Sequence, residues 1–405
     1  MQIRAEHSST KNIFGRRRRI AVEMSRPSKQ EEMVGFPVPD YRFDQKNEMF
    51  KRAFWDEQFE TQRTRFYNEV GFQDKPGWGK VDFSIRNAAW NVEWSFGMGN
   101  SRSNSGLYAW EGIHPKAERF VRTGGRVEGT PSEMSNVVKK AALHLGADLV
   151  GICRVHPNWV YSHEYNLITQ EHYPLELPKG CDNAVVMAIE MDYHTLRSSS
   201  MVLQGFATGH AYSKMAFLAN MVAAFIRGLG YRAVPCGNDT ALSIPLAMAA
   251  GLGEWSRMGL LVTKKFGPRV RLCKVFTDLP LAHDHFEPFG VVEFCKTCKT
   301  CASNCPSQAI SHGQMTTEGP NISSHSGALK WYINAEKCYT YWGTRRTDCT
   351  QCIRVCPFNK MPGKIHDLSR FLIKRAPLFN RLLVKLDEVL GYQKTLPVSR
   401  FWGKG

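Results

Sequence analysis

Two closely spaced runs of cysteine in the C-terminal third constrain this chain more than any other feature of its sequence. The first run has the pattern Cys-x2-Cys-x2-Cys-x3-Cys-Pro, and the second has the pattern Cys-x2-Cys-x3-Cys-Pro with one further cysteine upstream. The eight thiols are those of Cys295, Cys298, Cys301, Cys305, Cys338, Cys349, Cys352 and Cys356. Eight thiolates in this arrangement are what two four-iron clusters need, because each such cluster takes four cysteine ligands.

The first run has the spacing of bacterial ferredoxins, in which three cysteines hold one cluster and the fourth reaches across to the other. By that logic one cluster is bound by Cys295, Cys298, Cys301 and Cys356, and the second by Cys305, Cys338, Cys349 and Cys352. Zinc is the alternative metal, but it needs four ligands closed around one ion, and the first run is too tightly spaced for separate zinc sites. The sequence therefore predicts a protein that transfers single electrons.

The rest of the chain is much longer than an electron carrier needs. The whole chain has 405 residues, which is enough for two or three domains, and it is 43% hydrophobic, which is enough for a sizeable core. The formal net charge of +16, from 53 Lys and Arg against 37 Asp and Glu, favours acidic partners, although solubility alone is the plain alternative. No segment reaches the roughly 18 apolar residues that a membrane span requires, so we expect a soluble or peripheral protein.

The N-terminal part of the chain divides into two regions of different composition. Residues 1–40 are polar and charged, and we expect them to be disordered. Their arginine run, Arg16–Arg19, is typical of half of a twin-arginine export signal, but Glu23 interrupts the apolar stretch that must follow, which favours a basic tail or a remnant. Residues 41–125 are rich in aromatic side chains, and their five tryptophans could either pack onto a core or line an apolar pocket.

Strands and helices alternate over residues 126–289, which predicts an α/β domain with a layered core. Apolar periodicity predicts a helix that begins at Ser132 and ends at Gly146, and further helices over 213–229 and 245–250. It predicts strands over 149–153, 184–189, 232–234 and 259–263. A two-cluster domain over 290–362 and a helical extension over 363–405 follow, the latter with an amphipathic helix over 368–390 that we expect to pack across the domain, with a role at a membrane surface as the weaker alternative.

Several turn motifs of the α/β domain are unusual, and they occur in a fixed order before the cysteine runs. They are Gly209-His210-Ala211-Tyr212-Ser213, Gly237-Asn238-Asp239-Thr240, Ser256-Arg257-Met258-Gly259 and Lys265-Phe266-Gly267-Pro268-Arg269-Val270-Arg271. Together with Pro357-Phe358-Asn359-Lys360 after the second run, they resemble the corrinoid-dependent reductive dehalogenases over residues 130–395. This resemblance implies a nitroreductase-like α/β domain that binds a base-off, cobalamin-type corrinoid, and two 4Fe–4S clusters that feed it electrons for the removal of halide from an organohalide.

The resemblance also implies roles for individual residues. Tyr212 matches the proton donor, Arg271 the residue beside it, Asn238 a residue at the substrate or its halogen, and Trp342 a residue that lines the pocket. We expect the charge of Arg271 to lower the pKa of the tyrosine, which is about 10 when the residue is free. We expect contacts to the corrinoid from Ser256, Gly259, Gly267 and Arg269. The Asp-x-His-x-x-Gly signature of a lower histidine ligand to cobalt is incomplete, because Arg197 occupies the glycine position.

Two other interpretations compete with this one. An epoxyqueuosine reductase shares the corrinoid and the clusters, and the basic charge would suit its tRNA substrate, but an aspartate is expected there at the position of Tyr212. A non-enzymatic electron carrier leaves the α/β domain unexplained. The dehalogenase interpretation implies a small organohalide substrate, an acidic electron donor, a small membrane anchor protein and no nucleic acid. It places the protein at the cytoplasmic membrane, and the incomplete export signal keeps a cytoplasmic location open.

Overall fold

The computed structural model describes residues 35–97, 106–112 and 114–403, so the arginine run and most of the predicted tail lie outside the described residues. Its main helices are α2 (Met49–Trp55), α3 (Glu60–Tyr67), α4 (Lys80–Val92), α5 (Pro115–Gly124), α6 (Pro131–His144), α8 (Met201–Gly228), α9 (Ser243–Ala249), α10 (Val291–Thr297), α12 (Ala335–Arg345), α14 (Lys364–Arg375) and α15 (Asn380–Val389). Single turns of helix are α7 (Tyr193–Leu196), α11 (Thr300–Ser303), α13 (Gln351–Arg354) and α16 (Val398–Phe401). No helix in these ranges is long and apolar enough to cross a bilayer.

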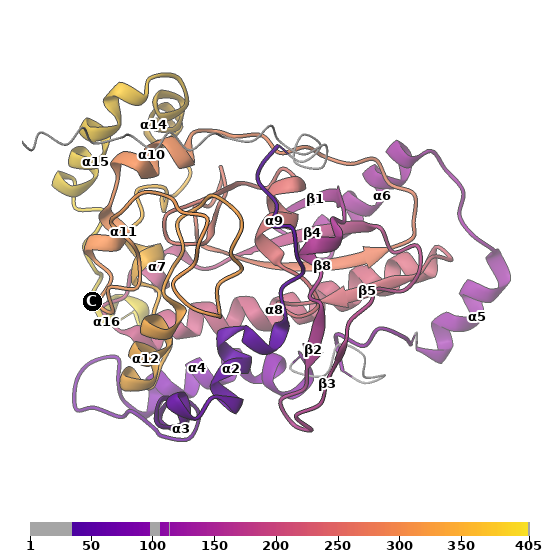
Figure 1. The fold of residues 1–405 in the computed structure, drawn as a ribbon, viewed down its shortest axis with the longest axis horizontal. Coiled ribbons are helices and arrows are strands. Elements are labelled where there is room, and N and C mark those ends of the chain that lie inside the picture. The colour runs from indigo at the N-terminus through magenta and orange to yellow at the C-terminus, as the bar shows by residue number, and fades with distance from the viewer. Residues whose placement is uncertain (1–34, 98–105, 113, 404–405) are drawn as a thin grey trace, which may run out of the picture.

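A four-stranded antiparallel sheet lies at the centre of the fold, with the strand order β1-β4-β8-β5 (Figure 1). Its strands are β1 (Leu149–Arg154), β4 (Asn183–Glu190), β8 (Val270–Thr277) and β5 (Ala233–Cys236). Two hairpins accompany it, formed by β2 (His163–Tyr165) with β3 (His172–Pro174) and by β6 (Glu254–Trp255) with β7 (Leu261–Val262). Helix α8 packs on one face of the sheet and α9 on the other, which gives the layered α/β architecture that the alternation predicts.

Alternation along β4 shows why both faces of the sheet are covered. Val185, Met187 and Ile189 point into the core that contains α8, whereas Ala184, Val186 and Ala188 point into the core that contains α9. Side chains of a strand point alternately to opposite faces, so a strand that is apolar throughout must be buried on both. The predicted strands around 149 and 184 are therefore confirmed with nearly the same bounds.

Several helix boundaries differ from those predicted, including α9, which begins two residues before the predicted start. Helix α6 begins at Pro131, because Thr130 and not Ser132 caps it in a reciprocal pair of hydrogen bonds with Glu133. Helix α8 begins at Met201, a full three turns before the predicted start, so the motif around Tyr212 lies within the helix. The predicted helix over 368–390 is two helices, α14 and α15, because Ala376 precedes Pro377 and adopts a non-helical backbone conformation.

Gly205 and Gly209, which made the start of α8 hard to predict, allow α4 to approach α8 closely. A Cβ atom at Gly209 would lie 2.2 Å from Cδ1 of Trp90, and one at Gly205 would lie 2.5 Å from Asp348 Oδ1. Helix α4, which carries Trp90, packs along α8, and the indole Nε1 donates to Gly205 O at 3.2 Å. Absence of a side chain at these two positions therefore allows the aromatic N-terminal region to sit directly on α8.

The cysteine segment has no separate core of its own. The cluster of buried residues beneath α8 continues through Phe289 and Phe294 to Cys295, Cys301 and Phe358. Phe358 packs edge-on against both Phe289 and Phe294, at centroid distances of 6.2 and 5.2 Å. Cys295, Cys298, Cys301 and Cys356 therefore belong to the same continuous hydrophobic core as the sheet.

We predict that Gly209→Ala destabilises the protein by about 1–3 kcal/mol, because the added methyl group must displace the rigid indole of Trp90. Gly228→Ala is the matched control, since Gly228 lies in the same helix and a Cβ there meets no atom within 4 Å. That substitution should be neutral or stabilise the helix. Denaturant unfolding of both variants tests the packing, and equal effects of the two substitutions would contradict it.

Candidate active site

A cavity of about 1330 Å³ opens between α4, α8, the end of β8 and the segments around Trp255, Trp331 and Trp342. Ordinary ligand pockets measure roughly 300–1,000 Å³, so this one has room for a large ligand together with a small one. Trp90, Trp94 and Trp342 are among the side chains that line it. Of the two roles considered for the N-terminal tryptophans, Trp90 and Trp94 serve as a pocket lining.

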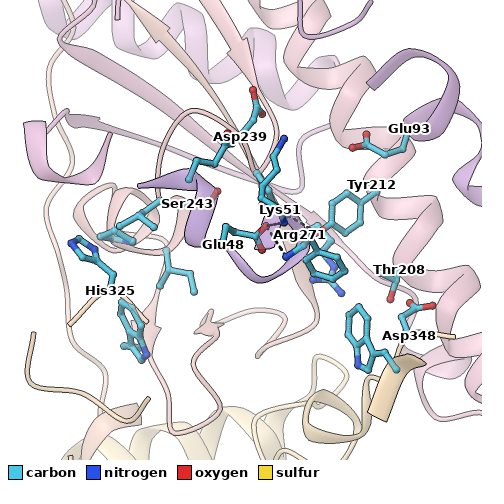
Figure 2. A pocket seen from close by; sticks show the side chains of 18 of the residues that line it. Glu48, Lys51, Glu93, Thr208, Tyr212, Asp239, Ser243, Arg271, His325 and Asp348 are labelled. Atoms are coloured by element: carbon cyan, nitrogen blue, oxygen red, sulfur yellow. Dashed lines mark hydrogen bonds between the residues drawn. The ribbon is translucent and has the colours of Figure 1, made fainter. Parts of the chain in front are cut away.

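Tyr212, Asn238 and Arg271 meet at the wall of this cavity although they come from α8, the loop after β5 and strand β8. Asn238 Nδ2 donates a hydrogen bond to Tyr212 Oη at 2.5 Å. The Arg271 guanidinium lies 5.2 Å from the centroid of the Tyr212 ring, and Trp90 stacks on the same ring at 4.9 Å. Because Tyr212 Oη accepts from Asn238, its own proton remains available to a molecule in the cavity (Figure 2).

A buried lysine that the sequence analysis missed holds the loop of Asn238. Lys274 is fully buried on β8, and its ammonium group donates to Gly237 O, to Ala241 O at 2.9 Å and to Ser243 Oγ at 3.1 Å. A lysine at the centre of the run Leu272-Cys273-Lys274-Val275-Phe276 was the available signal, since buried lysines are rare unless their donors are satisfied. Lys274 thereby places Asn238 against Tyr212.

The pKa of Tyr212 is raised above its usual value of 10, contrary to the expectation that Arg271 would lower it. Burial is the larger effect and disfavours the charged tyrosinate, whereas the Arg271 charge lowers the pKa and Glu93 and Glu48 raise it. The Asn238 hydrogen bond also lowers it. Tyr212 is therefore protonated near neutral pH, and its anion would be stabilised by Arg271 and Asn238 only once it formed.

Glu93 is a second titratable group of the cavity that the sequence analysis did not identify. It follows α4 in the π-helical turn η3 (Glu93–Gly97), and Figure 2 shows Glu93 and Arg271 to either side of the Tyr212 ring in that view. Burial, reinforced by the charge of Asp239, raises the pKa of Glu93 to about 8. Its backbone N–H donates to Ser213 Oγ at 3.3 Å, which fixes the turn against α8.

The Glu93 carboxyl should make the stability of the protein depend on pH. Its pKa rises from 4.5 to about 8 on folding, so between those values the native state binds a proton that the unfolded state does not. Stability should therefore fall as the pH rises from about 4.5 to 8, and Glu93→Gln should remove that part of the dependence. Unfolding of both proteins at a series of pH values tests this, and parallel curves would contradict it.

The cavity wall carries polar donors that have no partner within the described residues. Trp255 Nε1, Trp342 Nε1 and Arg271 Nε are buried and make no hydrogen bond there. All three residues line the cavity. Unsatisfied buried donors are costly, so their convergence on one space fits a large ligand that bears hydrogen-bond acceptors.

The four residues expected to contact a corrinoid lie outside the lining of this cavity. Ser256 Oγ donates to Leu260 O at 2.7 Å. Arg269 pairs with Glu190 at 2.9 Å and donates to Phe266 O and Lys360 O. Gly267 faces the backbone of Phe358, and Gly259 faces Ile333. Gly259, Gly267 and Arg269 thus make internal contacts that join the α/β domain to the cysteine segment, and contact of these residues and of Ser256 with a corrinoid stays a prediction.

The eight cysteines of the two runs gather in the two predicted groups. Burial raises the pKa of the Cys356 thiol, and the neighbouring thiols of Cys295, Cys301 and Cys298 raise it further. The Cys338 thiol is affected in the same way by Cys349 and Cys305. Cys352 responds to thiols of both groups, so the groups adjoin. Buried thiols this close resist ionisation until a metal centre compensates their charge, which fits two iron–sulfur clusters.

The remaining cysteines are Cys153, Cys181, Cys236 and Cys273, and all four are buried and unpaired. Cys236 lies two residues before Asn238, but its thiol contacts Val234 O and lies in the core beneath α9. These four thiols therefore act as small apolar residues of the core.

Comparisons with known proteins agree with this arrangement of thiols and cavity. Residues 294–359 match the family described as a 4Fe-4S double cluster binding domain, which defines an iron–sulfur redox protein. The chain is 35% identical to the tetrachloroethene reductive dehalogenase of Desulfitobacterium hafniense, over 79% of this chain and 69% of that protein. It is 34% identical to the enzyme of the same name from Sulfurospirillum multivorans, over 80% and 68%. The chain therefore belongs to the reductive dehalogenase family, a family of oxidoreductases.

A solved structure shows the same fold. It is a reductive dehalogenase whose description concerns a mechanism for B12-dependent dehalogenation, and it is 25% identical with a TM-score of 0.70. The match covers 89% of this chain but 48% of that one, so this chain spans about half the length of the solved relative. Both findings agree with the predicted fold class and separate the chain from a simple electron carrier.

Replacing one cluster ligand should remove iron selectively. Cys356→Ser should lower the iron and acid-labile sulfide content by up to half, because it removes a thiolate from one of the two groups. Cys153→Ser is the control, since this buried thiol contacts only Leu246 O and lies outside both groups. Iron analysis with electron paramagnetic resonance of the reduced protein tests the assignment, and full iron in Cys356→Ser would contradict it.

Proposed function

We propose that this protein catalyses the reductive removal of halide from a small organohalide. Two electrons and one proton replace the halogen with hydrogen, and halide leaves as the anion. The observation that carries this proposal is the meeting of Tyr212, Asn238 and Arg271 at the wall of a large cavity. Membership of the reductive dehalogenase family supports it and favours it over the tRNA-modifying alternative.

We propose that the cavity holds a cobalamin-type corrinoid as well as the substrate. Its volume and the unpartnered donors of Trp255, Trp342 and Arg271 fit a large ligand with polar groups at its rim. A corrinoid, when bound, supplies a low-valent cobalt that can deliver electrons to a carbon–halogen bond. The two clusters would relay those electrons from an acidic donor, which the net charge of +16 favours.

The chain itself supplies the proton and the electrostatic environment for it. Tyr212 is protonated at neutral pH, since burial raises its pKa, and its hydroxyl proton is free to move into the cavity. As the proton leaves, negative charge develops on Oη, where the Asn238 donor and the Arg271 cation are already in place. Groups that interact more strongly with the developing charge than with the neutral tyrosine lower the barrier to proton transfer.

The aromatic walls favour a small, apolar substrate. Trp90 and Trp94 stack on each other at 6.0 Å, and Trp342 packs against Phe50 and Phe66 at 5.6 and 5.8 Å. Such walls exclude water from the reacting bond and hold an uncharged organohalide by apolar contact. Chlorinated ethenes, on which the named relatives act, are therefore the first substrates to test.

Tyr212→Phe should reduce halide release by at least about 100-fold, the usual contribution of a positioned acid, while iron and corrinoid contents stay unchanged. Tyr161→Phe is the matched control, because it removes a hydroxyl from another tyrosine that lines the same cavity. Halide release from chlorinated ethenes, ethanes and phenols, measured with a strong one-electron reductant, provides the assay. Wild-type protein loaded with both cofactors that releases no halide would refute the function, and an active Tyr212→Phe would refute the role of the tyrosine.

A further inference from the structure

Arg257 is a buried cation that the proposed chemistry does not use. Arg257 lies in the turn between β6 and β7, and only 1% of its surface is exposed to solvent. No carboxylate of the described residues lies within ion-pair distance of it, and its hydrogen-bond acceptors among these residues are backbone carbonyls. A charge this deep is expensive to bury, so a compensating negative charge is expected nearby.

The contacts of Arg257 lead directly to one group of cysteines. Its Nε and Nη2 donate to the carbonyl of Cys295 at 3.1 and 2.8 Å. Its Nη1 donates to Ser311 O at 2.8 Å and to Gly313 O at 2.9 Å. Cys295 is the first cysteine of the first run, so the guanidinium is hydrogen-bonded to the main chain of a predicted cluster ligand.

The guanidinium also borders the cavity wall. It lies 4.5 Å from the ring centroid of Trp331, which is buried and lines the cavity. The indole Nε1 of Trp331 donates to Gly313 O at 3.1 Å, so Trp331 and Arg257 donate hydrogen bonds to the same carbonyl oxygen. Arg257 thus occupies the layer between the cavity and the first group of cysteines.

We propose that Arg257 sets the reduction potential of the cluster held by Cys295, Cys298, Cys301 and Cys356, and keeps it higher than these thiolates would give by themselves. A four-iron cluster with four thiolates is anionic, and reduction adds one further negative charge. Arginine stays protonated at every working pH, so its charge favours the reduced cluster. Burial strengthens the effect, because neither solvent nor salt screens the pair well.

This role is one of tuning and positioning, since Arg257 contacts the backbone of a ligand and not the reacting atoms. The nearby cation Lys360 differs, because it forms an ion pair with Asp387 and therefore contributes little net charge at the cluster. The inference rests on the proposed electron relay through the clusters. Its measurement does not, since a potential can be determined whether or not any halide is released.

The test is a redox titration of the cofactor-loaded protein, followed by electron paramagnetic resonance, on three variants of Arg257. Arg257→Met removes both the charge and the hydrogen bonds, and Arg257→Gln removes the charge but keeps a hydrogen-bond donor. Arg257→Lys keeps the charge but loses the planar set of donors of the guanidinium. We expect one of the two clusters to become harder to reduce in Arg257→Met and Arg257→Gln, with a clearly smaller shift in Arg257→Lys. The other cluster serves as an internal reference and should not shift.

Arg227→Met is the matched control for loss of a buried arginine. Arg227 is also buried and donates to the carbonyls of Ala233, Gly112, Ala109 and Trp110, all of which lie outside the cysteine segment. It should lose stability without a change in either potential. Unchanged potentials in the Arg257→Met and Arg257→Gln proteins, or an equal shift in Arg257→Lys, would overturn the inference. Loss of iron from all three variants would also overturn it, in favour of a structural role at the Cys295 loop.

The two proposals can fail separately. Wild-type protein that shows the expected dependence of one potential on Arg257 but releases no halide would refute the dehalogenase function alone. Normal halide release together with potentials that ignore residue 257 would refute the tuning role alone.

Discussion

Buried cations held by backbone carbonyls organise the site of this protein. Lys274, Arg227 and Arg257 are each almost fully buried, and they donate mainly to main-chain oxygens of irregular segments. Hydrogen bonds to charged donors contribute about 1.5–3 kcal/mol each, roughly twice the contribution of neutral ones. A single cation can therefore gather several loops that have no regular hydrogen bonding of their own. Lys274 does this for the loop of Asn238, and Arg257 joins helix α10 at Cys295 to the loop of Ser311 and Gly313.

The position of Tyr212 depends on the contact between α4 and α8. Gly209 lets the Trp90 indole approach the helix closely, and the same indole stacks on the Tyr212 ring one turn further along. This stacking helps to shield the phenol of Tyr212 from water. Loss of contact with water is the main cause of the raised pKa of Tyr212. The glycine of the Gly-His-Ala-Tyr motif and its tyrosine therefore act together. Gly209 leaves room for Trp90, and Trp90 shields Tyr212 from water.

Local patterns predicted much of this fold, because strands β1 and β4 are apolar throughout and helix α6 has a clear apolar period. The cysteine spacing likewise predicted two groups of thiols that the structure brings together. The start of α8 was missed because Gly205 and Gly209 disfavour a helix locally, and only the contact with α4 explains them. Glu93 and Lys274 were missed because their significance comes from burial, which a single sequence does not show.

Two residues of the turn motifs join the sheet to the cysteine segment. Gly267 closely approaches the backbone of Phe358, and Arg269 binds Glu190 and the carbonyl of Lys360. Their function is to fix the cysteine segment to the sheet. That attachment matters for electron transfer, because it holds both groups of thiols at fixed positions relative to the cavity. Helix α12 strengthens the same coupling, since it carries Cys338 and, one turn later, Trp342 on the cavity wall. Arg257 and Trp331 connect the group of Cys295 to another part of the cavity wall. A motion of the cysteine segment would therefore also move the side chains that line the cavity. Under the proposed electron relay, a rigid joint of this kind would keep the distance between the clusters and a ligand in the cavity constant.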